Sequence, residues 1–494
     1  MDYLNLFLVI VLSCIFIKLV INSVAKRNLP PGPYPLPIIG NLLQLGRKPH
    51  ESLTQLAKVH GPLMSLKLGS LTTIVISSPT IAKEVLQKHD QSFSSRILLD
   101  AVTMVDDHKY SMIWLPASPQ WRALRKLTNS HLFTTQKLDS NQNLRQQKLD
   151  ELVSYVGRNA SSGSAVDIGQ AAFTTVLNLM SNSFLSIDLA DYSSDSGSTF
   201  KNTIRAIMWE AGKPNVSDYF PVLRFLDLQG IRRRTGNYIR ILDEIFNKII
   251  DQKLLALQSG EGNSSDLLDV ILDPSNENGI QLQRHEINTL LKDFFAAGTD
   301  TSSSTVEWAM AELLHNPSKM TKAQQEISTI IGKDRLIKET DIVRLPYLQA
   351  IVKETLRLHP PVPFLVPHKA VVDVKMHNFL VPQDAQVIVN VWAMGRDPTI
   401  WTDPISFNPE RFLDSKVDYR GQDFELIPFG SGRRSCPGLP LAHRMVHLIV
   451  GLLVQSFDWK LENGMRPEDL NMEEELGFTL AKATDLRAIP TDRL

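Results

Sequence analysis

Apolar side chains recur at three- and four-residue intervals in several long segments, which is the spacing of one helix face. The clearest segment begins near residue 287, and Asn316-Pro317 ends it because proline cannot continue a helix. Its periodic residues are Ile287, Leu290, Leu291, Phe294, Ala297, Thr301, Trp308 and Leu313. Pro346 can open a second helix that ends before His359, and the apolar run 439–457 predicts a third.

Shorter segments carry the pattern of β-strands. Apolar and polar residues alternate over 64–68, Gly69-Ser70 supplies a turn, and 73–77 is rich in β-branched residues, so we expect a hairpin. A further strand is expected over 387–391. Polar loops are expected at three serine-rich stretches, 159–164, 193–198 and 259–265. The chain is therefore predicted to be mainly α with a smaller β portion.

The amino-terminal segment predicts a membrane anchor. No charged side chain occurs over 3–17, and the chain stays mostly apolar to residue 25. A helix of about 23 residues, rising about 1.5 Å each, crosses a bilayer core of about 30 Å. Lys26 and Arg27 follow directly, so the positive-inside rule places the rest of the chain in the cytosol. We expect residues 1–27 to form one transmembrane helix, with a cleaved signal peptide as the alternative.

A proline-rich spacer follows the anchor. Residues 28–41 contain five prolines, which remove backbone donors and fix φ, so this segment is neither helix nor inner strand. It predicts a stiff extended connection between the anchor and a globular body at 42–494.

Charge and cysteine content exclude two classes of protein. Lys and Arg total 52 against 53 Asp and Glu, so the chain lacks the basic excess of a nucleic-acid binder. Two cysteines among 494 residues exclude a disulfide scaffold. Cys14 falls in the predicted anchor, which leaves Cys436 as the only cysteine of the body.

The residues around Cys436 point to a reactive or metal-binding thiol. The stretch 429–438 is FGSGRRSCPG, in which three glycines let the backbone approach a neighbour closely. Pro437 suits the first position of the helix that follows, whose free N–H groups favour a thiolate. No other cysteine or histidine is near enough in sequence for a structural zinc site. A metal ligand, a nucleophile and a buried structural cysteine all remain open at this point.

Four motifs in order resemble those of the cytochrome P-450 family, the haem-thiolate monooxygenases. The stretch 429–438 resembles the haem-binding loop, and AGTDT at 297–301 resembles the oxygen-activation part of the central helix. ETLR at 354–357 is similar to the Glu-x-x-Arg helix, and FNPERF at 407–412 to the segment that supplies a second arginine. The resemblance covers essentially the whole chain. It implies the cytochrome P-450 fold and haem b, with Cys436 as the axial thiolate ligand of the iron.

The resemblance also implies roles for individual residues. Asp300 and Thr301 would be the acid–alcohol pair that delivers protons, whereas an ordinary back-bonded helix threonine is the alternative for Thr301. A carboxylate–guanidinium network would support the haem loop without a catalytic role, and its members are Glu354, Arg357 and Arg411. The expected haem contacts are Arg96, Trp121, Arg125, His368, Phe429, Arg434 and Gly438. Many family members have arginine where this chain has His368.

The expected substrate pocket is apolar, so regiochemistry should come largely from shape. Its residues by family position are Trp114, Phe294, Ala297, Val362, Leu365, Val366 and Phe478, with plain core packing as the alternative for each. Segments at 29–41, 173–180, 218–221 and 345–350 resemble plant microsomal members that include geraniol hydroxylases and mint-family diterpene oxidases. This implies NADPH- and O2-dependent hydroxylation, in one or successive steps, of a mono- or diterpenoid in plant specialised metabolism.

The expected partners follow from what the chain lacks. It has no flavin or nicotinamide fingerprint, so NADPH-cytochrome P-450 reductase is the expected electron donor, and Arg122, Lys126, Arg433 and Arg444 are candidates to meet it. We expect contact with membrane lipid, no nucleic acid, and a single-pass endoplasmic reticulum protein whose catalytic domain faces the cytosol. Three alternatives remain: oxidation of another apolar metabolite (fatty acid, phenylpropanoid or xenobiotic), a haem-thiolate isomerase or dehydratase, and a non-enzymatic haem sensor.

Overall fold

The computed structural model describes residues 28–192, 195–259, 266–272, 282–332 and 334–493, and the predicted anchor at 1–27 lies outside them. The described chain is mainly helical with a smaller sheet portion, as predicted. The α-helices are α2 (Leu42–Leu45), α3 (Pro49–His60), α4 (Pro79–Lys83), α5 (Pro119–His131), α6 (Thr135–Ser140), α7 (Gln142–Ser162), α8 (Ile168–Leu185), α9 (Asp195–Gly212), α10 (Val216–Tyr219), α11 (Ile231–Gln258), α12 (Leu267–Leu272), α13 (Arg284–His315), α14 (Pro317–Ile330), α15 (Pro346–Leu358), α16 (Val391–Gly395) and α17 (Leu439–Ser456). The strands are β1 (Leu63–Leu68), β2 (Leu71–Ile76), β3 (Ser95–Arg96), β4 (Val166–Asp167), β5 (His368–Lys369), β6 (Val374–Met376), β7 (Phe379–Val381), β8 (Gln386–Val389), β9 (Phe457–Leu461), β10 (Glu474–Leu476), β11 (Leu480–Lys482) and β12 (Arg487–Asp492).

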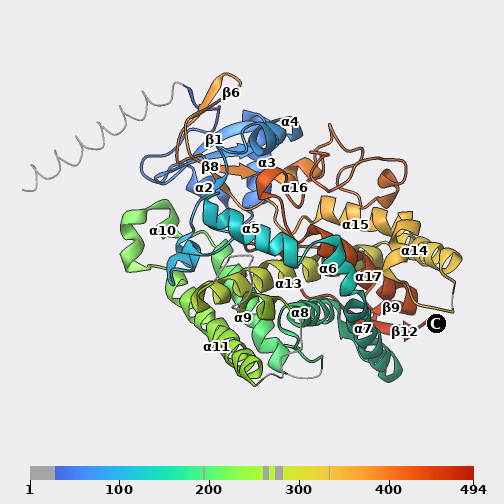
Figure 1. The fold of residues 1–494 in the computed structure, drawn as a ribbon. Helices are drawn as coiled ribbons and strands as arrows, with labels where there is room; N and C mark the ends of the chain where they lie inside the picture. Colours follow the sequence, from blue (N-terminus) through green and yellow to red (C-terminus); the bar gives the residue numbers. More distant parts are fainter. Residues whose placement is uncertain (1–27, 193–194, 260–265, 273–281, 333, 494) are drawn as a thin grey trace, which may run out of the picture.

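The largest sheet has the strand order β1-β2-β8-β5-β3 and lies to one side of the helices (Figure 1). β1 and β2 pair antiparallel up to Leu68 opposite Leu71, which confirms the hairpin, and Gly69 at φ +58° forms its turn. β8 joins β2 in parallel, which confirms the strand expected near 387. At the other edge, Arg96 of β3 pairs with His368 of β5, so two expected cofactor contacts are cross-strand neighbours.

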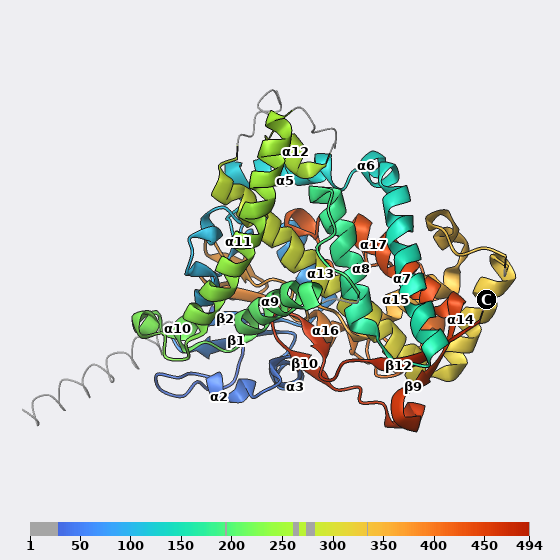
Figure 2. The ribbon, with the colours of Figure 1, turned by 90° about the horizontal axis from the view of Figure 1, so that it is seen from below.

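Helix α13 crosses the middle of the helical part, between α9, α8 and α17 (Figure 2). Gln283 and Glu286 form a capping box at its start, and Asn316-Pro317 stops it as predicted. Gly298 has a packing role here. A Cβ at this position would lie 2.6 Å from the Met180 methyl carbon of α8, so glycine allows the two helices to approach. The helix continues unbroken through 297–301.

Helix α17 is the one helix among the described residues that is long and apolar enough to cross a membrane. Its apolar window is 67% buried inside the protein, so we assign it to the core rather than to a bilayer. Its buried side chains, from Met445 to Ser456, pack beside α13, α14 and α15. The predicted apolar helix at 439–457 is therefore confirmed to within one residue.

Two predicted loops are wrong in part. Helix α7 continues to Ser162 and ends at left-handed Gly163, and α9 already begins at Asp195. The polar side chains at the end of α7 bond back to the preceding turn: Asn159 Nδ2 donates to the Tyr155 carbonyl at 2.9 Å. These bonds let polar residues remain helical, which composition alone does not reveal. Of the third predicted loop, 260–265 lies outside the described residues.

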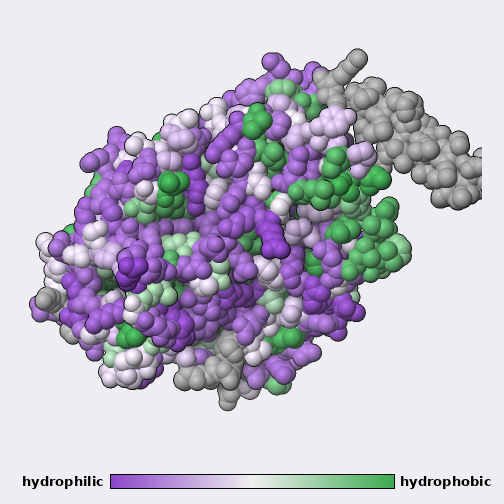
Figure 3. Space-filling model, turned by 180° about the vertical axis from the view of Figure 1, so that it is seen from behind, coloured by the Kyte–Doolittle hydropathy of each residue, from purple (hydrophilic) through white to green (hydrophobic). Residues whose placement is uncertain are grey.

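Exposed apolar side chains gather at one edge of the molecule (Figure 3). They come from the proline-rich spacer with the following helix α2, and from the 3₁₀ segment η5 (Pro221–Leu226) with the turn after it. They include Ile38, Leu43, Val222, Phe225 and Leu228. The two segments are joined through the β1–β2 turn, because Gly40 bridges to Leu68 and Ser70 donates to the Tyr219 carbonyl at 2.8 Å. We call this set the apolar edge. Such a contiguous apolar surface is typical of an interaction site.

Candidate active site

A large cavity lies beside α13, and Cys436 opens onto it. The thiol is exposed to this cavity and enclosed by the surrounding protein. Burial raises its pKa, while the Gly438 and Leu439 amides and the Arg125 charge act in the opposite direction. The expected helix-end donors are therefore present and favour the thiolate, but burial outweighs them in the free protein. A bound metal cation is what would hold the sulfur deprotonated.

The loop before Cys436 depends on two glycines with left-handed backbone. Gly430 has φ +69° and Gly432 has φ +70°, a conformation that other residues adopt at a cost. A Cβ on Gly432 would lie 2.0 Å from the Leu86 carbonyl oxygen, so its close approach is to the π-helical turn η2 (Glu84–Lys88). Helix α17 starts at Leu439 with Gly438 as N-cap, so Pro437 precedes the helix rather than opening it.

Three arginines line the cavity without an acidic partner. Arg96, Arg125 and Arg434 take part in no ion pair among the described residues, and they donate only to backbone carbonyls. Arg125 donates to the Ser435 carbonyl at 2.7 Å, and the buried Arg96 Nε has no partner at all. Burial and the charge of Arg434 lower the pKa of Arg96 to about 9. Buried cations left uncompensated in this way predict an anionic ligand.

His368 and Trp121 also line the cavity, but their protons are directed elsewhere. His368 Nδ1 lies 2.6 Å from the Phe93 carbonyl, so it carries the proton of the neutral ring and leaves Nε2 as an acceptor. Burial and the neighbouring Arg96 lower the pKa of His368 well below its usual value. The Trp121 indole donates to the Met112 carbonyl at 3.1 Å, and the Arg434 guanidinium lies over its ring. Neither residue donates into the cavity in this arrangement.

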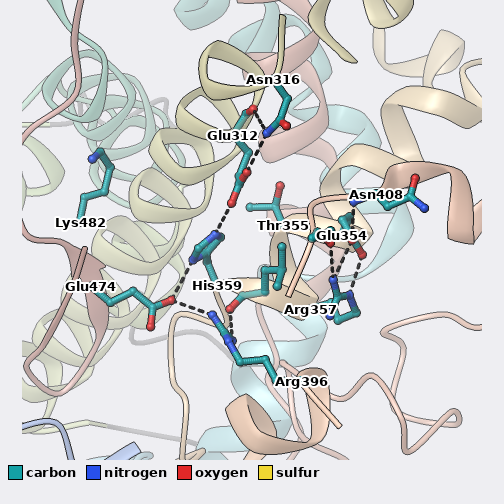
Figure 4. A network of polar contacts seen from close by, with 12 residues as sticks. Glu312, Asn316, Glu354, Thr355, Arg357, His359, Arg396, Asn408, Glu474 and Lys482 are labelled. Carbon is teal, nitrogen blue, oxygen red and sulfur yellow. Dashed lines mark hydrogen bonds and ion pairs between the residues drawn. The ribbon is translucent and has the colours of Figure 1, made fainter. Parts of the chain in front are cut away.

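The carboxylate–guanidinium network is buried (Figure 4). Arg357 Nε and Nη2 each donate to the Glu354 carboxylate at 2.7 Å, and Arg411 Nε donates to it at 3.0 Å. The Asn408 amide adds a further bond at 2.7 Å. The network joins α15 to the segment containing η7 (Pro409–Phe412), as the motifs predict.

Asp300 and Thr301 are adjacent on α13, but their side chains do not bond to each other. Thr301 faces the cavity, and its Oγ1 donates to the Ala297 carbonyl at 2.7 Å, which is the back-bonded geometry of the alternative reading. The Asp300 carboxylate accepts a hydrogen bond from Thr479 Oγ1 at 2.5 Å. Burial raises the pKa of Asp300, while Thr479, Arg205 and Lys201 lower it. Asp300 itself does not line the cavity, and its partner Thr479 lies in the turn between β10 and β11 at the cavity wall.

Six of the seven expected pocket residues line the cavity. These are Trp114, Ala297, Val362, Leu365, Val366 and Phe478, whereas Phe294 does not. Phe294 packs against Phe184 with ring centroids 5.4 Å apart, because its position on α13 faces α8. Phe429 lines the cavity as well, and Gly438 does not. Sequence analysis missed three polar lining residues, which are Ser111, Asp293 and Thr479. Only Asp293 could have been found from the sequence, because it lies four residues before Ala297 on the same helix face.

A second buried polar cluster lies next to the Glu354 network (Figure 4). His359 Nε2 lies 2.7 Å from Glu312 and Nδ1 2.9 Å from Glu474, and the ring stacks on Trp308 at 3.8 Å. Arg396 donates to the same Glu474 carboxylate at 3.1 Å. Burial lowers the pKa of His359, but the two glutamates outweigh it and the pKa is raised. The cluster therefore ties α13 to α15, α16 and β10 through a cationic histidine.

This cluster predicts a pH-dependent contribution to stability. Because the pKa of His359 is raised in the folded state, protonated His359 makes its full contribution to the free energy of unfolding below pH 6.5. This contribution is lost as the pH rises through the folded-state pKa. We expect the difference in unfolding free energy between wild type and His359→Gln to be larger at pH 6.5 than at about pH 9. Denaturant titration at both pH values measures it. A difference that grows with pH would contradict the assignment.

Comparison with known proteins agrees with this geometry. The sequence profile described as Cytochrome P450 matches residues 30–486. The chain belongs to the cytochrome P450 family. The geraniol 8-hydroxylase of Swertia mussotii is 53% identical over 466 residues, which are 94% of each protein. The geraniol 8-hydroxylase of Catharanthus roseus is 51% identical over 492 residues, 99% of this chain and 100% of that one. The drimenol monooxygenase of Persicaria hydropiper is 48% identical over 491 residues, 99% and 97% respectively.

This P450 is accordingly a haem-thiolate monooxygenase with haem b as its cofactor. Enzymes of the family use O2 and electrons from a partner reductase. The cavity fits that group. It offers one thiol to an iron and three uncompensated arginines to two propionates, and the orphaned Arg96 Nε is a donor awaiting an acceptor. His368 can join them only by accepting a proton or by turning Nδ1 away from Phe93.

Proposed function

We propose that this P450 hydroxylates a plant terpenoid, a mono- or diterpenoid, with NADPH and O2. The observation that carries the proposal is the cavity itself, in which Cys436 and Thr301 face a largely apolar lining. When bound, haem supplies the activation of dioxygen and the transfer of one oxygen atom into a C–H bond. An apolar lining favours a hydrocarbon skeleton over a charged substrate.

The relatives support the terpenoid class. Geraniol and drimenol, which appear in their names, are both terpenoids, and the sequences align over nearly their full lengths. Microsomes containing this P450 and a reductase, incubated with NADPH and a panel of terpene alcohols and hydrocarbons, test the proposal by mass spectrometry. A product 16 mass units heavier than a terpenoid in the panel, absent without NADPH, supports it. Oxidation confined to fatty acids or phenylpropanoids would contradict it.

The geometry of the site supports a role for each of its residues. We assign the axial ligand to Cys436, the propionate contacts to Arg96, Arg125 and Arg434, and the support of the loop to the network of Glu354. Trp121, His368 and Phe429 complete the walls around the same cavity. Gly438 does not line the cavity, and we assign it the backbone amide that donates a hydrogen bond to the Cys436 sulfur.

We assign proton delivery to Asp300 and Thr301. Lys201 and Arg205 stabilise the Asp300 charge, and Arg205 pairs at 3.3 Å with Asp485, whose side chain is 50% exposed. The charges around this buried carboxyl thus include one that pairs with a solvent-exposed residue. Thr301 Oγ1 already donates to Ala297, so its lone pairs can accept a hydrogen bond from a water in the cavity and hold that water where it can deliver a proton. Thr479 positions the carboxylate by donating to it.

Thr301→Ala should uncouple the enzyme. We expect substrate binding and NADPH consumption to persist, because the haem site and the apolar walls are unchanged. Product formed per NADPH should fall about 100-fold, the lower end of the range for a lost general acid–base group. Simultaneous measurement of NADPH, hydrogen peroxide and product in a reconstituted system gives the coupling. Thr301→Ser retains the hydroxyl and should lose much less, whereas wild-type coupling in Thr301→Ala would reduce Thr301 to a back-bonded helix residue.

We propose a single-pass protein of the endoplasmic reticulum membrane, with anchor 1–27, spacer 28–41 and a cytosolic catalytic domain at 42–494. The apolar edge supports this arrangement, because it includes spacer residues that directly follow the anchor. For reductase docking, Arg122 and Lys126 are exposed and form no ion pair with any residue of the described chain. Arg433 pairs with Asp90 at 2.8 Å and Arg444 with Glu339 at 2.5 Å, so these two are less suited to a partner.

Deleting 1–27 should weaken membrane retention and preserve haem incorporation. The family profile begins at residue 30, and the described core begins after the anchor. The apolar edge should leave partial binding to lipid vesicles. Fractionation together with the carbon monoxide difference spectrum checks both points. Loss of the spectrum would mean that the first residues are needed for the fold.

A further inference from the structure

One face of α13 lines the cavity along several turns. Thr289, Asp293, Ala297 and Thr301 recur at four-residue intervals, and all four contribute to the cavity wall. The wall is polar at positions 289 and 293 and apolar at 297. Eight residues separate Asp293 from Thr301, which is about 12 Å along the helix axis. The cavity thus has a polar end well separated from the residue assigned to proton delivery.

Asp293 is a buried carboxylate with no cationic partner in the described chain. It is 8% exposed, and it accepts hydrogen bonds from Ser111 Oγ at 2.8 Å and the Met112 amide at 2.7 Å. The adjacent Lys292 instead pairs with Asp107 at 2.7 Å and Asp243 at 2.6 Å. Burial raises the pKa of Asp293 to about 7, although the hydrogen bonds from Ser111 and from the Met112 and Ile113 amides lower it.

The bonding capacity of Asp293 is not exhausted. A carboxylate accepts about four hydrogen bonds, and the contacts above supply three donors. His108, from the neighbouring 3₁₀ turn, also lines the cavity, and its Nδ1 is buried without a partner. Burial lowers the pKa of His108, so its ring is the neutral form that can both donate and accept. Two polar groups with spare hydrogen-bonding capacity therefore face the polar end of the cavity.

We propose that Asp293 binds a hydroxyl group at one end of the substrate, which places the opposite end of the molecule beside Thr301. The inference rests on the proposed terpenoid function and narrows its substrate class to an elongated terpene alcohol. A hydroxyl suits this site because it can donate to the carboxylate or accept from the protonated acid. It also carries no charge to bury. Ser111 positions both the carboxylate and the loop before Trp114, because its Oγ also accepts a hydrogen bond from the Trp114 amide at 3.3 Å.

Binding titrations of the holoenzyme test this inference. The two ligands are geraniol and the matching hydrocarbon with a methyl group in place of the hydroxymethyl group, and the signal is the Soret shift on binding. Wild type should bind geraniol at least about tenfold more tightly, the usual effect of a hydrogen bond to a charged or buried acidic group. Asp293→Ala should bring the two dissociation constants to within about threefold. It should do so mainly by weakening geraniol.

Ser111→Ala is the matched control, since it loosens the same loop and keeps the carboxylate. It should retain the preference for the alcohol. Equal weakening of both ligands by Asp293→Ala would reduce Asp293 to a loop-holding residue and overturn the inference. If Asp293→Ala loses its carbon monoxide spectrum, the same titrations are made with Asp293→Asn, whose oxygen can still accept the hydrogen bond from Met112. An unchanged preference of Asp293→Asn for the alcohol overturns the inference, and a reduced preference supports it. Equal affinities in wild type overturn the inference alone, whereas no response to either ligand overturns the terpenoid function as well.

Discussion

Cys436→Ser should abolish the red-shifted Soret band of the reduced, carbon-monoxide-bound protein. That band reports a thiolate ligand, and Cys436 is the only cysteine of the described chain. In the free protein burial raises the pKa of the thiol, so the thiolate depends on the metal. A serine hydroxyl is a harder donor with a far higher pKa and does not replace it. Monooxygenase activity should fall to background with the band.

Ser435→Ala is a suitable control for this experiment. This substitution changes the side chain next to Cys436 but keeps the backbone carbonyl of residue 435, which accepts a hydrogen bond from Arg125. The thiolate spectrum should therefore persist. Both proteins are compared at equal haem content by absorption spectroscopy. Retention of the thiolate spectrum in Cys436→Ser would exclude Cys436 as the ligand.

Local patterns predicted the elements of this fold well. The hairpin of β1 and β2, the strand β8 and the limits of α13 and α15 agree with the structure to within a few residues. These features depend on alternation, helical period and proline, which act within a few positions of the chain. The end of α7 was missed because side-chain bonds to the preceding turn outweighed composition.

Contacts between distant segments were the harder part of the site. Gly298 packs against Met180, and Gly432 packs against Leu86. These contacts join segments far apart in the chain, so local sequence patterns do not predict them. Asp300 bonds to Thr479, 179 positions later, although the motif suggested its neighbour Thr301. Phe294 has the period of the pocket face but points to α8. Family resemblance indicated the ligand loop and the arginines, whereas the remaining hydrogen-bonding capacity of Asp293 became apparent only from its partners in the fold.

Arg357→Lys should strongly destabilise the protein although it conserves the charge. All five donors of Arg357 are used: two bond to Glu354, and the others meet the carbonyls of Gly395, Pro404 and Ser406. Both members of the pair are 0% exposed. Lysine offers three donors on one nitrogen and leaves Glu354 and carbonyls unpaired. Breaking a buried pair costs about 3–5 kcal/mol, against a typical total of about 5–15 kcal/mol.

The same substitution at Arg466 provides the control for that prediction. Arg466 also forms an i,i+3 pair, with Nε 2.8 Å from Asp469, but its side chain is 67% exposed. Water and counterions screen such a pair, so Arg466→Lys should leave the unfolding midpoint nearly unchanged. Denaturant midpoints and the yield of haem-containing protein compare the two variants. Arg357 lies on α15 and the haem ligand lies in the loop before α17, so loss of haem in Arg357→Lys alone would link the network to that loop. Equal denaturant midpoints for Arg357→Lys and Arg466→Lys would contradict the conclusion that burial makes the Arg357–Glu354 pair important for stability.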